Sequence, residues 1–358
     1  MGGAAVAAVR AVWLACLLLL AMVPAWAADL PQEVTDAAPP AAEELEGKDF
    51  SGGIAALLEQ GTTLLGEALR ENLRGAVLIL GVVLLCGAAD AVLRTPESPM
   101  RRFLPMAGAA AIAVLSLGSM KSLLGLGTQT IEELDVFSKA LLPTLAAAVA
   151  ASGGIVSAGV KQVATAFFAE LLITLIRNVF MPLVYVCAAA ASAEAMLPGH
   201  GLGRIGKGVS KAVTWVLTGA LILFTGYLAV SGALSGSSDA LTAQLTKNAI
   251  STAVPVVGGI ISDAAGSVLA GALVLKNAVG AFGMLAVLAI CLLPFLRLAV
   301  QYLLYKLTAF LAATVGSAPL VGLIDALGSA FGLVLGMAGC CSLLLLISIA
   351  SSVQVVVS

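Results

Sequence analysis

Blocks of about 20 consecutive apolar residues recur along most of the chain, and short polar or glycine-rich segments separate them. An α-helix needs about 20 such residues to cross roughly 30 Å of hydrocarbon. The blocks at 76–93 and 212–230 are uninterrupted, whereas those at 140–160, 163–197 and 253–275 contain proline, glycine or charged residues. The pattern predicts an all-α, multi-pass transmembrane helical bundle of about six to eight membrane elements, some broken or re-entrant.

The N-terminal residues 1–27 have the pattern of a signal peptide. Arg10 supplies a positive charge, 11–23 form a short apolar core, Pro24 ends it, and Ala-Trp-Ala at 25–27 fits a small-x-small cleavage site. Cleavage there places the new N-terminus outside the cytosol.

Two further segments precede the first apolar block. Residues 28–50 are acidic and rich in proline, alanine and glutamate, so we expect a disordered extracytoplasmic segment. Leucines at helical spacing in 51–75 predict an amphipathic helix whose apolar face rests on the membrane, on the bundle or on a partner. Residues 76–358 form the predicted transmembrane helical domain.

Charged loops indicate the topology. Arginines at 94–102 and the basic residues Arg204, Lys207 and Lys211 favour cytosolic loops, and the mixed segment 121–139 suits the outer face. This assignment requires an odd number of crossings between residues 139 and 198. Either one of the two intervening blocks is re-entrant or the longer block crosses twice.

Composition supports the membrane interpretation. Among the 358 residues 60% are hydrophobic and only 11% are charged, whereas soluble domains have about 45–50% apolar and about 25% charged residues. Abundant alanine and glycine let helices approach closely. The chain lacks the short alternating segments of a β-barrel and the basic, aromatic-interleaved patch that nucleic-acid binding needs.

Signatures of catalysis are missing from the sequence. Gly201 to Gly206 match GxGxxG, but a membrane segment precedes them instead of a strand. His200 is the single histidine, and Walker A, HExxH, GxSxG and CxxC patterns are absent. We therefore expect no enzyme activity, no catalytic residue, no cofactor and no metal site.

Charged residues within or beside apolar blocks are the better functional signal, because a charge in the bilayer usually faces a partner or water. Glu170 and Arg177 are seven positions apart, a spacing that allows both to line the bundle interior. The alternative is that such charges mark helix ends at the interface. The candidate transport or assembly residues of this kind are Asp90, Glu170, Arg177, Asp263, Lys276 and Asp325.

Gly328, Gly332 and Gly336 recur at every fourth position and are followed by Cys340. A stripe of small residues at this spacing is typical of close helix contact, so these glycines are the candidate helix-packing stripe. The same stripe is a candidate contact between copies of the chain in a homo-oligomer.

Several motifs together resemble the stage III sporulation protein AE family of endospore-forming bacteria, over about residues 55–355. The most specific pair is VPVVGGIISDA at 254–264 followed by LKNAVG at 275–280. Further matching motifs are LLPTL at 141–145, SAGV at 157–160, LLPF at 292–295, and GSAPLV at 316–321 with Asp325 and Gly328. Through the first pair, Pro255, Gly258, Gly259 and Asn277 join the candidate transport or assembly residues.

The resemblance implies a function that composition does not. Members of that family are polytopic, permease-like subunits in the mother-cell membrane around the forespore. They work in a channel or secretion-like complex that sustains late forespore gene expression and spore formation. The implied partners are other membrane proteins and the ATPase of the same operon, a forespore-side channel protein, and membrane lipid.

A free-standing secondary transporter of a small solute or ion is the alternative. The interrupted segment from Pro255 to Asp263 and the membrane-embedded charges resemble features of midplane substrate sites. The absence of a convincing inverted repeat argues against it. An intramembrane enzyme is disfavoured because no nucleophile–base pair is evident.

Overall fold

The computed structural model describes residues 32–38, 50–92, 99–197, 199, 201–253 and 258–353. The predicted signal peptide at 1–27 lies outside these residues. The elements are α2 (Gln32–Asp36), α4 (Phe50–Val92), α5 (Pro99–Ala151), α6 (Ile155–Leu175), the π-helical segment η1 (Ile176–Phe180), α7 (Met181–Met196), α8 (Leu202–Ala253), α9 (Gly258–Ala312) and α10 (Ala318–Val353). No strand occurs in the described residues, so the predicted all-α class is confirmed.

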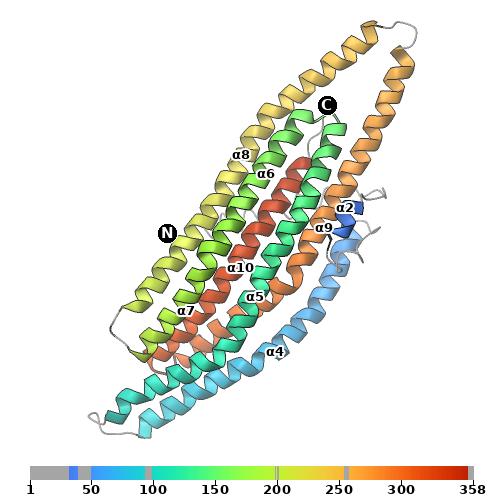
Figure 1. The fold of residues 1–358 in the computed structure, drawn as a ribbon. Helices are drawn as coiled ribbons and strands as arrows, with labels where there is room; N and C mark the ends of the chain where they lie inside the picture. Colours follow the sequence, from blue (N-terminus) through green and yellow to red (C-terminus); the bar gives the residue numbers. More distant parts are fainter. Residues whose placement is uncertain are drawn as a thin grey trace.

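The long helices lie side by side along one common direction (Figure 1). In the most apolar stretches of α9 and α10, 72% of the residues are buried, against 17% in α4. Helix α10 contacts α5, α6, α7, α8 and α9. It is therefore the central helix, while α4 and α8 cover opposite sides of the bundle (Figure 1).

Six helical segments of the described chain are long and apolar enough to cross a membrane, in agreement with the predicted number. They are Phe50–Val92, Phe103–Ala151, Ala158–Met196, Gly203–Ser231, Ala270–Ala312 and Ala318–Val353. This number and the bundle architecture define a multi-pass membrane protein.

Helix α4 joins the predicted amphipathic helix and the first apolar block in one continuous rod. It runs parallel to α9, with Gly53 against Leu285 near its start and Gly87 against Val315 near its end. Small residues face α9, whereas Leu65 remains exposed. Exposed leucines on the outer side of α4 leave an apolar surface that the bundle does not cover.

Segment 121–139 belongs to α5, which continues through it as a helix. Its position on the outer face stays a prediction. Buried Leu124, Ile131, Leu134 and Phe137 recur at helical spacing and pack into the core. The intervening charged residues lie on the opposite side of α5, where helix continuation leaves them accessible.

The predicted break in block 140–160 occurs at residues 152–154. Gly153 adopts a φ of 96°, a left-handed conformation that favours glycine, and the Gly154 N–H donates to the Val149 carbonyl at 3.0 Å. Helix α6 then returns antiparallel to α5.

Block 163–197 forms one rod from α6 through η1 to α7. Pro182 lies at the start of α7 and has no N–H to donate to the preceding turn. The π-helical turn at Ile176–Phe180 directly before it accommodates that interruption without ending the helix. The longer block is thus one continuous helical segment and not two short spans that cross twice.

The glycine stripe of α10 packs against α9 at two of its three positions. A Cβ added to Gly328 would lie 2.9 Å from the Tyr305 Cβ, and one added to Gly332 would lie 2.9 Å from the Tyr302 ring. Gly336 has no neighbouring atom within 4 Å of that position. The absence of side chains at these two glycines thus brings the first half of α10 close to the last part of α9.

Within the segment expected to be disordered, α2 contacts α5. Val34 of α2 is fully buried in the main core cluster. The flanking positions 28–31 and 39–49 lie outside the described residues.

Candidate functional site

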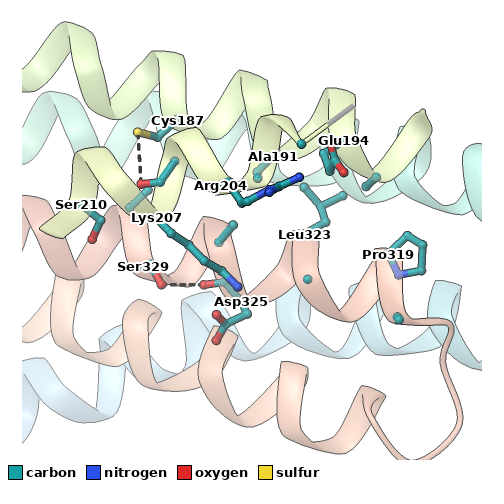
Figure 2. Close-up of a pocket in the computed structure, with 18 of the residues that line it drawn as sticks. Cys187, Ala191, Glu194, Arg204, Lys207, Ser210, Pro319, Leu323, Asp325 and Ser329 are labelled. Carbon is teal, nitrogen blue, oxygen red and sulfur yellow. Dashed lines mark hydrogen bonds between the residues drawn. The ribbon is translucent and has the colours of Figure 1, made fainter. Parts of the chain in front are cut away.

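A cavity of about 650 Å³ opens between the end of α7, the start of α8 and the first half of α10 (Figure 2). Small residues from all three helices line it, among them Ala191, Gly206, Gly322 and Ala326. Because these side chains are too short to fill the space between the helices, a hollow remains where larger residues would close the contact.

The connection from α7 to α8 forms one edge of the cavity. Gly199 and Gly201 have φ values of 110° and 73°, a conformation that other residues rarely adopt. The Glu194 carboxylate accepts a hydrogen bond from the Gly199 N–H at 3.3 Å. A helix, α7, precedes this glycine-rich segment, so it lacks the strand that a dinucleotide-binding fingerprint requires.

Three basic side chains of α8 line the cavity: Arg204, Lys207 and Lys211. Their spacing of three and four residues places them on one face of the helix. The ion pairs formed among the described residues do not include any of them. All three are exposed to solvent as well as lining the cavity.

Asp325 of α10 lines the opposite wall and is paired with Lys306 of α9. The Lys306 Nζ donates to the Asp325 Oδ1 at 2.6 Å and to the Ser329 Oγ at 2.9 Å. Lys207 points from α8 toward Asp325 (Figure 2), but the two groups form no ion pair. The lining therefore has three cations against the carboxylates of Glu194 and Asp325, and Lys306 pairs with Asp325, so basic charge predominates around the cavity.

Glu170 and Arg177 lie on the outer surface, so the interior position considered for them is wrong. Their side chains are 64% and 50% exposed. Glu170 pairs with Lys139 at 3.7 Å, and Arg177 pairs with Glu132 at 3.0 Å. The first pair joins α6 to α5 and the second joins η1 to α5. Because both pairs form on the surface, these charges stay outside the apolar interior.

The structure does not gather the remaining candidate residues into one site. Lys276 of α9 is 1% exposed, and Asn277 and Asp90 are partly buried. Gly258 and Gly259 begin α9 and Asp263 follows in its second turn, while Pro255 lies outside the described residues. Among the candidates that the structure describes, Asp325 alone lines the cavity.

Polar contacts inside the bundle were missed by the sequence analysis. The Lys161 Nζ donates to the Ser351 carbonyl at 2.6 Å although Lys161 is only 4% exposed. The Tyr305 hydroxyl donates to the Ser116 Oγ at 3.0 Å. A lysine between two closely spaced apolar blocks was a signal for the first contact. The second contact joins residues 189 positions apart and had no such signal.

The fold and the cavity define a polytopic helical membrane protein with a basic interhelical cavity. The family model for stage III sporulation protein AE matches residues 51–356, and the chain belongs to that family. It is similar to stage III sporulation protein AE of Bacillus subtilis (strain 168), with 28% identity over 214 residues. The match covers 60% of this chain and 54% of that relative. No solved structure matches.

Proposed function

We propose that this protein is the permease-like, pore-forming membrane subunit of a secretion-like channel complex between mother cell and forespore. The observation that carries the proposal is the family match across 51–356, the same residues that form the bundle. In this role the protein is not an enzyme. It resides in the mother-cell membrane around the forespore and supports late forespore gene expression.

The partners of this role are other membrane proteins and the ATPase of the same operon, together with a forespore-side channel protein. The outer surface of α4 supports such assembly. Leu58, Leu65, Leu69 and Leu73 are 44–67% exposed there, next to charged residues that keep part of the same helix in water. A partner helix or a second copy of the chain has a ready apolar contact on this face.

Deletion of the gene in its host tests the role directly. Sporulating cells are scored for completed engulfment and for a late forespore-specific reporter. We expect engulfment to finish while the reporter stays silent and the forespore shrinks, with both effects reversed by the wild-type gene. Normal spores in the deletion strain would refute the proposal.

A secondary transporter is the second candidate, favoured by the buried lysines. Lys161 and Lys276 are 4% and 1% exposed in a membrane protein, and ionisable groups at such positions often mark ion or substrate paths. Solute or proton flux by the purified protein alone in liposomes supports this function. A flux equal to that of protein-free liposomes excludes it.

A further inference from the structure

The basic cavity is not explained by the proposed function. Arg204, Lys207 and Lys211 share one face of α8 and all line the same hollow. Lys306 pairs with Asp325, and Glu194, which accepts from the Gly199 N–H, is the other carboxylate of the lining. Three cationic groups in and around one cavity favour a negatively charged ligand.

The position of the cavity along α8 narrows the class of ligand. The basic residues end at Lys211, and the apolar part of the span begins with residue 212. Trp215 is 80% exposed one turn further on. Tryptophan concentrates at the head-group level of membranes, and basic residues flank spans at the same depth. The cavity therefore lies where a lipid head group would be.

The lining itself is suited to a molecule with a charged and an apolar part. Opposite the three cations, Pro319, Leu323 and Leu333 of α10 contribute apolar surface. The volume of about 650 Å³ falls within the range of small-molecule sites, about 300–1,000 Å³. Basic pockets between membrane helices bind anionic lipid head groups through the same combination.

We propose that this cavity binds the phosphate-bearing head group of an anionic phospholipid, with Arg204, Lys207 and Lys211 as the phosphate ligands. The site is independent of the role in sporulation, since it depends only on the cavity and its charges. Free phosphate esters share the head-group chemistry, and the apolar lining distinguishes the lipid from them.

Binding is measured on the full-length purified protein in detergent after delipidation. Phosphatidylglycerol is added, with phosphatidylcholine of the same acyl chains as the neutral comparison and glycerol 3-phosphate as the soluble comparison. Bound lipid is quantified by mass spectrometry and the thermal midpoint Tm is recorded. We expect phosphatidylglycerol to bind and to raise Tm, and we expect phosphatidylcholine and glycerol 3-phosphate to do neither.

Two triple variants separate this site from general attraction to basic proteins. R204Q/K207Q/K211Q removes the charges in the cavity, and R70Q/R74Q/K121Q removes three exposed charges outside it. The first should weaken phosphatidylglycerol binding by about tenfold or more, because each basic group near a lipid head contributes to affinity. The second should bind as the wild type does. Equal loss in both variants overturns the proposal.

A cavity-filling variant keeps every charge. Gly322 lines the cavity, and a Cβ added to it meets no atom within 4 Å, so the side chain of Gly322→Leu starts in open space. We expect an unchanged Tm without lipid and a loss of phosphatidylglycerol binding. Undiminished binding by this variant, or binding of glycerol 3-phosphate as tight as that of the lipid, would show that the cavity is not a phospholipid site.

Discussion

Pairing with distant residues determines where charged side chains lie in this protein. Asp325 meets Lys306 across 19 positions, and Arg177 meets Glu132 across 45. The sequence shows that these charges interrupt apolar blocks, but it does not show which helices become neighbours. Their positions in or beside apolar blocks were therefore evident from the sequence, whereas their partners and exposure were not.

The Lys306–Asp325 pair should stabilise the contact of α9 with α10. Lys306→Met removes the cation and leaves the half-exposed Asp325 carboxylate without its ion-pair partner. We expect a loss of about 1.5 kcal/mol, since hydrogen bonds to charged groups are worth about 1.5–3 kcal/mol and both side chains are partly exposed. The measurement is the Tm in detergent.

Asp325→Asn supplies the control for that pair. In the Lys306→Met background it should recover most of the lost stability, because no unpaired charge remains. Additive losses in the double variant would show that the pair is not coupled.

Tyr305 tests the buried polar contacts. Its hydroxyl donates to Ser116, and both residues are at most 2% exposed. Tyr305→Phe should lower stability by about 1 kcal/mol by leaving the Ser116 hydroxyl without its donor. Ser116→Ala added to Tyr305→Phe should then cost little more. A Tm for Tyr305→Phe equal to the wild type would contradict this contribution.

Helix boundaries show what a hydrophobic pattern can and cannot predict. The break at 152–154 followed from its glycines, and the last span followed from continuous apolar sequence. The charges of segment 121–139 predict a position at the outer face, which stays a prediction, but they do not end the helix, because its apolar residues keep helical spacing. A charge cluster therefore does not mark the end of a helix that continues beyond the hydrocarbon.

The α9–α10 contact gives a matched pair of glycine substitutions. Gly328→Ala places a methyl group 2.9 Å from the Tyr305 Cβ, which is fixed to the backbone, so the helices must separate. We expect a loss of about 1–3 kcal/mol. Gly336→Ala meets open space and should gain up to about 1 kcal/mol from helix propensity. Equal effects on Tm would exclude tight packing at Gly328.

The cavity could not be predicted as a unit. Its basic residues were recognised from the sequence as a topology signal, but its walls come from residues 187–211 and 318–333. Only the fold shows that the start of α10 faces the start of α8. The hollow also exists because alanine and glycine line it where larger side chains would fill the space. Composition alone does not show where such small residues face one another.

The dimensions of the whole molecule exceed those of a bilayer. Helix α5 has 53 residues and is therefore about 80 Å long at 1.5 Å per residue, against a hydrocarbon thickness of roughly 30 Å. Part of it must project into water. The exposed charges from Glu132 to Lys139 identify that part, and the exposed apolar residues near Val114 identify the membrane-embedded part.

Cysteine labelling distinguishes these two regions. The variants are Glu133→Cys and Val114→Cys, each in a background without native cysteines. Both native residues are exposed on the surface of the bundle. In open membrane fragments, a membrane-impermeant maleimide should react with the cysteine at 133 and hardly at all with the one at 114, because the thiolate that reacts does not form in hydrocarbon. After solubilisation and denaturation both should react alike. If position 133 is protected in membranes, the charged surface of α5 and α6 lies against a protein partner instead of water. If position 133 is labelled and position 114 is not, the membrane boundary lies between these two positions of one continuous helix.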